Sequence, residues 1–204
     1  LTNFAGPGTF TGSYPMYDQN LIAIGNTFYG LTVSGGSYDY GTFFKINSDG
    51  SGFEKLLDFN GEATGIGPRG TLIFDGVFLY GMTTSGGSNN YGIIFKIKPD
   101  ATGFEKLFDF DGNNGKYPFA SLATDGTLLY GMTKNGGSDD LGTVFKLKKD
   151  GSNFEKLLDF SGITNGSDPW GSLLIDGTFL YGTTYQGGTN KMGTLFKLKT
   201  DGSY

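Results

Sequence analysis

The sequence contains neither cysteine nor histidine, and these two absences exclude several kinds of site. Without cysteine there is no disulfide, no thiolate nucleophile and no cysteine-ligated zinc. Without histidine there is no Ser-His-Asp triad, no histidine general base and no imidazole ligand for a transition metal. The sequence also has no unique constellation of polar residues. We therefore expect no catalytic residue, no metal and no cofactor, and we predict a protein that is not an enzyme.

Positive charge and long apolar runs are scarce as well. The 204 residues carry a formal net charge of −5 at pH 7, which disfavours a nucleic-acid partner because such partners favour clustered lysine and arginine. No apolar run approaches the roughly 18 residues of a membrane span, so we expect no membrane insertion. No signal peptide is recognisable, which is compatible with a mature or trimmed form.

What the sequence does contain is glycine, aromatic residues and an internal repeat. It has 37 glycines and 16% aromatic residues, and since disordered chains are poor in aromatics, the chain is expected to fold. A Tyr-Gly pair recurs every 50 or 51 residues within similar surrounding text, which marks four repeat units. The four pairs begin at Tyr29, Tyr80, Tyr130 and Tyr181.

Each repeat unit reads as four short β-strands. In units two to four an Asp-Gly pair separates the first two apolar runs, and this pair is the strongest short signal for a hairpin. A Gly-Gly loop ends the second run, a run such as GTVFKLK forms the third, and FEKLLDF forms the fourth. No stretch has the 3.6-residue period of a helix, so almost no helix is expected.

Four strands in about 50 residues, repeated along the chain, are typical of the blades of a β-propeller. A blade packs both of its faces on neighbouring blades, which accounts for the apolar residues on both faces of GTVFKLK. We predict an all-β, four-bladed β-propeller with four antiparallel strands per blade, in a single domain over residues 1–204. The blade units cover approximately residues 21–60, 71–110, 121–160, and 172–204 together with 1–6.

The first six residues resemble the end of a repeat. LTNFAG matches LLDFSG at residues 157–162, with Phe4 at the position of Phe160, whereas the fourth unit ends at KTDGSY before any such run. We predict that residues 1–6 pair into the last blade as its fourth strand and close the ring. An open array would leave a bare strand edge, which promotes aggregation.

The repeat text LYGMTxxGGSxxxGTVFKLxxDGxxFEKLLDF, followed by a glycine-rich loop and YPFASL, resembles the GloVer-type tandem repeat of bacterial exported proteins. The resemblance also rests on the proline before each new first strand, which is Pro68, Pro118 or Pro169. It covers nearly the whole chain and implies a repeat architecture and a secreted or cell-surface location. It brings no catalytic motif, and no anchoring or sorting segment is recognisable in this sequence.

Three patterns have both a functional and a structural interpretation. Residues 65–70 match the G-x-G-x-x-G dinucleotide motif, but a strand is expected after them where that motif needs a helix. Carboxylates such as Glu155 and Asp159 suit glycoside hydrolysis. Their repetition on the outermost strand favours the interpretation that they are solvated charges on the outer edge of each blade. Loops such as residues 139–140 offer too few oxygens for Ca²⁺, and a role in turns is favoured.

Positions at which the repeats differ are better candidates for a ligand site, since a residue kept in every blade serves the fold. The residue after each interblade proline varies, and we expect it near one mouth of the channel, at the entry to the innermost strand. The candidate ligand-binding residues at this position are Met16, Arg69, Phe119 and Trp170. Aromatic side chains there suit the apolar faces of sugars, and the alternative is that they only plug the narrow ring.

We therefore predict a non-enzymatic, exported binding or adhesion module, with carbohydrate as the first ligand class and a glycan or a cell-surface protein as the partner. A structural or protein-interaction scaffold in a surface or filament assembly is the alternative from another class, since propellers host many functions. A carboxylate-based glycoside hydrolase or lyase is the third hypothesis, and it requires a carboxylate pair about 5–10 Å apart at the channel mouth.

Overall fold

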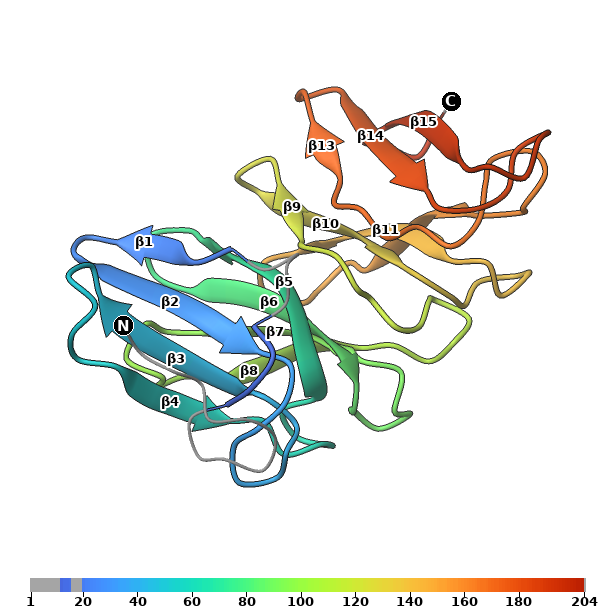
Figure 1. Cartoon of the computed structure of the whole chain (residues 1–204). Helices are drawn as coiled ribbons and strands as arrows, with labels where there is room; N and C mark the ends of the chain where they lie inside the picture. The colour runs from blue at the N-terminus through green and yellow to red at the C-terminus, as the bar shows by residue number, and fades with distance from the viewer. Residues whose placement is uncertain (1–11, 16–19, 204) are drawn as a thin grey trace. The chain divides into compact units, whose positions relative to one another are not determined.

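The structure of the chain is a computed structural model that describes residues 12–15 and 20–203 (Figure 1). The described residues form 15 β-strands and no helix, which confirms the predicted all-β class. The chain divides into two compact units, residues 1–109 and residues 110–204, and the boundary falls between the second and third repeats. Each unit holds two sheets, one for each repeat.

The first unit contains two four-stranded antiparallel sheets in which the strands follow one another in chain order. One sheet consists of β1 (Ile22–Ile24), β2 (Thr27–Thr32), β3 (Thr42–Asn47) and β4 (Glu54–Asp58). The other consists of β5 (Ile66–Phe74), β6 (Leu79–Ser85), β7 (Ile93–Ile97) and β8 (Glu105–Asp109). Each repeat of this unit therefore forms its own sheet, as the strand pattern predicted.

The second unit repeats this plan. Its first sheet has four antiparallel strands, β9 (Ala123–Thr124), β10 (Leu128–Thr133), β11 (Thr143–Lys148) and β12 (Glu155–Asp159). Its second sheet has three strands among the described residues, β13 (Leu174–Ile175), β14 (Phe179–Thr184) and β15 (Thr194–Lys199). The predicted closing strand, residues 1–6, lies outside the described residues.

The strand register explains why a glycine follows the repeated tyrosine. In the second repeat Gly81 lies directly opposite Phe95 of the neighbouring strand. A Cβ atom on Gly81 would meet the Cζ atom of Phe95 at 2.7 Å and the Cδ2 atom of Leu72 at 2.9 Å. The aromatic ring therefore lies over the bare backbone of the glycine, and a larger residue would displace it.

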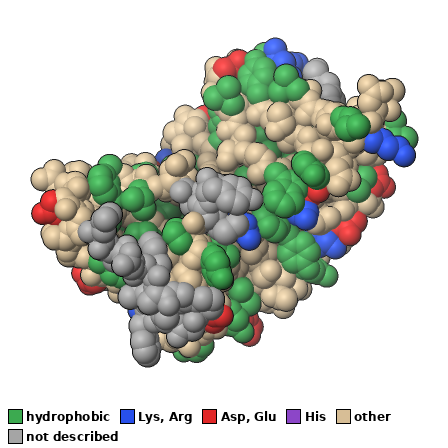
Figure 2. Space-filling model, viewed as in Figure 1, with side chains coloured by type: hydrophobic (Ala, Val, Ile, Leu, Met, Phe, Trp, Pro, Cys, Tyr) green, Lys and Arg blue, Asp and Glu red, His purple; other side chains and the backbone are tan. Residues whose placement is uncertain are grey.

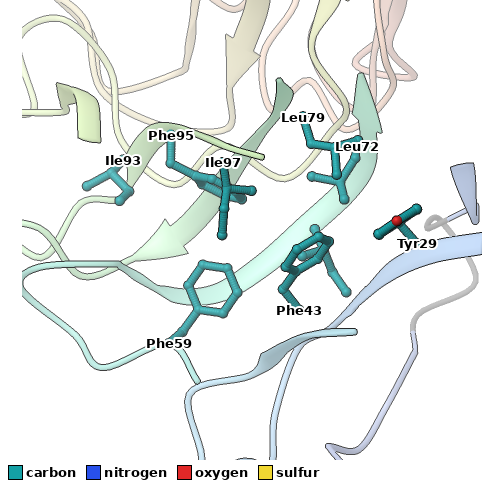
Figure 3. Packing of buried hydrophobic residues seen from close by; sticks show 9 residues of the cluster. Tyr29, Phe43, Phe59, Leu72, Leu79, Ile93, Phe95 and Ile97 are labelled. Atoms are coloured by element: carbon teal, nitrogen blue, oxygen red, sulfur yellow. The ribbon is translucent and has the colours of Figure 1, made fainter. Parts of the chain in front are cut away.

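In the first unit, one core is built from the facing sides of both sheets (Figure 3). Phe43 and Phe59 of the first repeat and Phe95 and Ile97 of the second are all fully buried in this cluster. The ring of Phe59 packs edge-on against that of Phe95, with 5.5 Å between their centroids. In this unit, one face of each sheet is therefore covered by the sheet of the neighbouring repeat.

In the second unit a corresponding core joins the third and fourth repeats. Val144 and Phe160 come from one sheet, and Leu180 and Leu198 come from the other. The ring of Phe160 packs edge-on against that of Phe196 at 5.3 Å, which repeats the contact between Phe59 and Phe95. The phenylalanine that ends one repeat therefore packs on the third strand of the following repeat in each unit.

The Asp-Gly turns are fixed by the repeated tyrosine. Asp125 accepts hydrogen bonds from the backbone N–H groups of Thr127 and Leu128 and from the hydroxyl of Tyr130. Desolvation by itself would raise the pKa of Asp125, but these three bonds outweigh it and lower that pKa below its usual value. Burial and the bond to Asp125 raise the pKa of Tyr130. The same pairs form between Asp75 and Tyr80 and between Asp176 and Tyr181.

We predict that Gly81→Ala lowers the free energy of unfolding by about 1–3 kcal/mol, because the added methyl group must displace the buried ring of Phe95. Gly171→Ala is the matched control, since its Cβ atom would have only the Oγ1 atom of Thr183 within contact distance, at 3.3 Å. Urea denaturation measures both variants. Equal stability of the two would contradict this interpretation of the Tyr-Gly pair.

Candidate functional site

The residue before each interblade proline has an unusual backbone conformation. Its φ angle is positive in all four repeats, with +53° at Tyr14, +61° at Gly67, +57° at Tyr117 and +58° at Asp168. Glycine adopts this region freely, whereas other residues do so at a cost of about 1–3 kcal/mol. The three repeats that lack glycine here hold a strained backbone directly before the candidate site residues.

Backbone hydrogen bonds hold this conformation in the second unit. The carbonyl of Tyr117 accepts a bond from the N–H of Lys134 at 3.1 Å, and that of Asp168 accepts one from the N–H of Tyr185 at 2.9 Å. The N–H of Asp168 donates to the carbonyl of Leu141 at 3.0 Å. Each proline loop is therefore tied to the residue that follows the second strand of its own sheet.

Three aromatic side chains lie together at the ends of these loops. The rings of Phe119 and Trp170 stack with a centroid distance of 5.4 Å and an interplanar angle of 29°. The ring of Tyr185 lies 6.0 Å from that of Trp170, tilted by 48°. Trp170 is 45% exposed and Tyr185 is 66% exposed. We call these three residues the aromatic platform.

A lysine and an aspartate accompany the platform. The Nζ atom of Lys134 lies 4.9 Å from the ring centroid of Trp170 and 5.4 Å from that of Phe119, within the range of a cation–π contact. It also lies 3.8 Å from the Oδ1 atom of Asp168, a buried oxygen that accepts no hydrogen bond. Lys134 therefore serves as the counterion of a carboxylate that is poorly solvated.

The structure brings two of the four candidate residues together. Phe119 and Trp170 form the stacked pair of the second unit. Arg69 lies in β5 of the first unit, opposite Met82 of β6, and is half-buried. Met16 lies outside the described residues.

Sequence reasoning missed Lys134 and Tyr185. Both occupy the same position of the repeat, two residues before the Gly-Gly pair, at the end of the second strand. The residue at this position varies as widely as the residue after the proline, and it is Val33 and Thr84 in the first two repeats. The rule that variable positions are the better ligand candidates would have found it if applied to every position.

The recurring carboxylates of the outer strands serve the fold. Asp159 accepts a hydrogen bond from the hydroxyl of Ser138 at 3.0 Å and pairs with Lys156 at 2.9 Å. Asp58 and Asp109 make the corresponding contacts in the first two repeats. Desolvation opposes ionisation of Asp58, but bonds from its lysine and serine partners lower its pKa. These carboxylates bind the fourth strand to the Gly-Gly loop of the same sheet.

The remaining motifs also have structural roles. The Oδ1 atom of Asp140 accepts the N–H of Gly136 at 2.7 Å, so this loop aspartate is a turn residue, as expected. Residues 66–70 lie within the strand β5, and no helix follows them as a dinucleotide site needs. Among residues 12–15 and 20–203, no group of three or more acidic side chains is placed to hold a metal ion.

Charge and hydropathy add two observations. Figure 2 shows acidic and basic side chains interspersed among hydrophobic ones on the face that it draws. No helix in the described part of the chain is long and apolar enough to cross a membrane.

Each repeat of about 50 residues forms one sheet, the sheets share the same strand order and register, and within each unit they pack face to face. These features define the chain as a β-propeller repeat protein. The chain belongs to the Gloeobacter/Verrucomicrobia repeat family, whose model matches residues 1–138 and 122–204. This membership confirms the resemblance that the repeat text indicated. No curated protein was found that matches the chain.

Solved structures with a similar fold include propellers of different function. A chain in a nidogen–laminin complex is 17% identical, with a TM-score of 0.57 over 89% of this chain and 63% of that one. TolB from Acinetobacter baumannii is 14% identical, with a TM-score of 0.59 over 98% and 43%. Oligogalacturonate lyase from Vibrio parahaemolyticus is 13% identical, with a TM-score of 0.56 over 97% and 51%. The chain spans 43 to 63% of the length of these structures, and the likeness shows the fold alone.

We predict that Lys134→Met and Asp168→Asn each lower the free energy of unfolding by about 1–2 kcal/mol and that their effects are not additive. Asparagine tolerates the positive φ of Asp168, so that substitution removes the charge without adding backbone strain. Thermal or urea unfolding of the two single variants and the double variant measures the coupling. Lys148→Met, at the exposed end of β11, is the control. Strictly additive effects would show that Lys134 is not the counterion of Asp168.

Proposed function

We propose that the protein is a non-enzymatic, exported binding or adhesion module that takes carbohydrate at the aromatic platform. The observation that carries this proposal is the exposure of Trp170 and Tyr185 beside the stacked ring of Phe119. An aromatic face is apolar, and so is one face of a pyranose ring, so the two pack together and exclude water. The family resemblance, which points to bacterial exported proteins, is the ground for the location.

The rigidity of the platform supports binding. The loop that carries Trp170 is held by two backbone hydrogen bonds at Asp168 and by the packing of Pro169, whose Cδ atom leaves no room for a side chain at Gly142. Because the loop is already ordered, a ligand that binds there does not have to immobilise it, and the entropic cost of binding is smaller. Strain that persists at one place is typical of functional sites.

Two other functions are weaker proposals. A protein-interaction scaffold in a surface or filament assembly is favoured by exposed apolar side chains. Ile163, in the loop before the last repeat, is 72% exposed, and Met192, in the last repeat, is 87% exposed. A glycoside hydrolase or lyase needs a pair of carboxylates with separate roles. The carboxylate beside the platform, Asp168, lies 3.8 Å from the Nζ atom of Lys134 in an ion pair.

A four-bladed ring that residues 1–6 close is the architecture that we propose for this module. Three phenylalanines at the ends of repeats pack edge-on against the third strand of the following repeat. These pairs are Phe59 with Phe95, Phe110 with Phe145, and Phe160 with Phe196. By the same alignment, we propose Phe44 of the first repeat as the partner of Phe4.

The last sheet offers a site for this closing strand. A pocket of about 250 Å³ opens at its Gly-Gly loop, lined by Gly187, Gly188 and Lys191 among others. In the third repeat, a Cβ atom added at Gly137, the equivalent of Gly188, would meet the carboxylate of Asp159 in the fourth strand. Asn3 stands at the position of Asp159 in the sequence, and its amide oxygen suits the hydroxyl of Thr189.

An uncovered face of the last sheet supports the same closure. Leu195 of β15 is 79% exposed. The residues at its position in the other repeats, Phe43, Ile94 and Val144, are fully buried. In a closed ring this face would pack on the first blade, and burial of Leu195 would contribute about 1.5–3 kcal/mol.

We predict that the wild-type protein binds oligosaccharides on a glycan array and that Trp170→Ala weakens this binding at least tenfold, since the largest exposed ring of the platform is lost. Trp170 is the only tryptophan, so its fluorescence reports binding at this site directly. Tyr38→Ala is the matched control, because Tyr38 is a 58% exposed aromatic residue outside the platform. An array without any bound glycan, together with self-assembly seen by light scattering, would favour the scaffold.

We predict that Phe4→Ala lowers the free energy of unfolding by about 3–5 kcal/mol, as burial of Phe4 in a ring interface would require. Phe160→Ala is the reference, because Phe160 is its fully buried equivalent. Deletion of residues 1–6 should lower the melting temperature further. If Phe4→Ala and the deletion both leave the melting temperature unchanged, residues 1–6 do not close the ring.

A further inference from the structure

We infer that the ligand of the aromatic platform is an uncharged linear oligosaccharide, bound through two consecutive sugar rings, with Trp170 and Tyr185 each holding one ring. This inference rests on the proposed carbohydrate function and adds the number of rings, the charge of the ligand and a second binding residue. Tyr185 supplies the second subsite.

The geometry of the two exposed rings indicates a two-ring ligand. Their centroids are 6.0 Å apart and their planes are tilted by 48°, so they present two adjacent faces in different directions. A single sugar ring can lie flat on only one of these faces. Two linked sugars, each turned relative to the other, can lie on both. Phe119 stacks on Trp170 at 5.4 Å and fixes the orientation of the indole.

The charges beside the platform favour an uncharged ligand. The ammonium group of Lys134, which contacts the rings of Trp170 and Phe119, already has Asp168 as its counterion at 3.8 Å. An acidic sugar would therefore meet a cation that is already neutralised, on a protein whose net charge is −5. An uncharged chain meets no such repulsion.

Lys134 can still orient an uncharged sugar. An ammonium group has three N–H donors. Its cation–π contacts with aromatic rings are electrostatic and do not require these N–H groups as hydrogen-bond donors. Lys134 lies between the platform and Asp168, so it can donate to a sugar hydroxyl while it remains near the carboxylate. Aromatic stacking with a polar group at its edge is a common arrangement in small-molecule sites.

The test uses arrayed series of one to four rings of β-1,4-linked glucose, β-1,4-linked xylose and α-1,4-linked galacturonic acid, together with a broad glycan array. The proteins compared are the wild type, Trp170→Ala, Tyr185→Ala and the control Tyr38→Ala. We expect binding to a neutral series, at least tenfold tighter for two rings than for one. Tyr185→Ala should remove this gain, so that two rings bind no more tightly than one, whereas Trp170→Ala should weaken the binding of one ring and of two.

Each other outcome overturns the inference. Equal affinity for one ring and for two, preference for the galacturonic acid series, or Tyr185→Ala binding as the wild type would each contradict it while the carbohydrate function stands. The same holds if both neutral series fail and the broad array shows binding only to charged or branched glycans. No bound glycan on any array would overturn the proposed function and this inference together.

Discussion

The burial of apolar sheet faces against the sheet of a neighbouring repeat is the constraint on which the rest of the structure depends. A repeat of 50 residues forms four short strands whose apolar side chains point to both sides, so a single sheet is not stable in water. Phe43 is buried in the first unit and Val144 in the second, each in a core that two sheets share. Stability therefore resides between repeats rather than within them, as in other repeat proteins.

This constraint explains which residues the repeats have in common. Gly81 leaves space for the ring of Phe95, and Tyr130 fixes the turn at Asp125. It also makes the last sheet exceptional, because Leu195 is exposed where its equivalents are buried. A closing strand from residues 1–6 and a first blade packed on this face would remove the exception.

The sequence predicted the fold well because the repeat is strict. The same strand and turn signals recur in every repeat and support one another, and the all-β class and the sheet order followed from them. The positive φ angle before the prolines could not be predicted, since Tyr14 and Tyr117 are of a residue type that rarely adopts it. Tertiary hydrogen bonds impose that conformation, and they have no local signal.

The candidate site was predicted only in part. Variation at one position of the repeat indicated Phe119 and Trp170, which do lie together. Tyr185 and Lys134 come from a second variable position, and only the fold shows that the two positions are neighbours. A repeat protein can thus keep its core residues constant and vary two adjacent positions, which is how one scaffold can present different surfaces.

The central claim, that residues 1–6 form the fourth strand of the last sheet, is tested most directly by hydrogen exchange of the backbone amides. The claim predicts that amides of β15 (Thr194–Lys199) exchange as slowly as those of β11 (Thr143–Lys148), its equivalent inside a four-stranded sheet, and that amides within residues 1–6 are also protected. Rapid exchange in residues 1–6, with β15 exchanging much faster than β11, would contradict it.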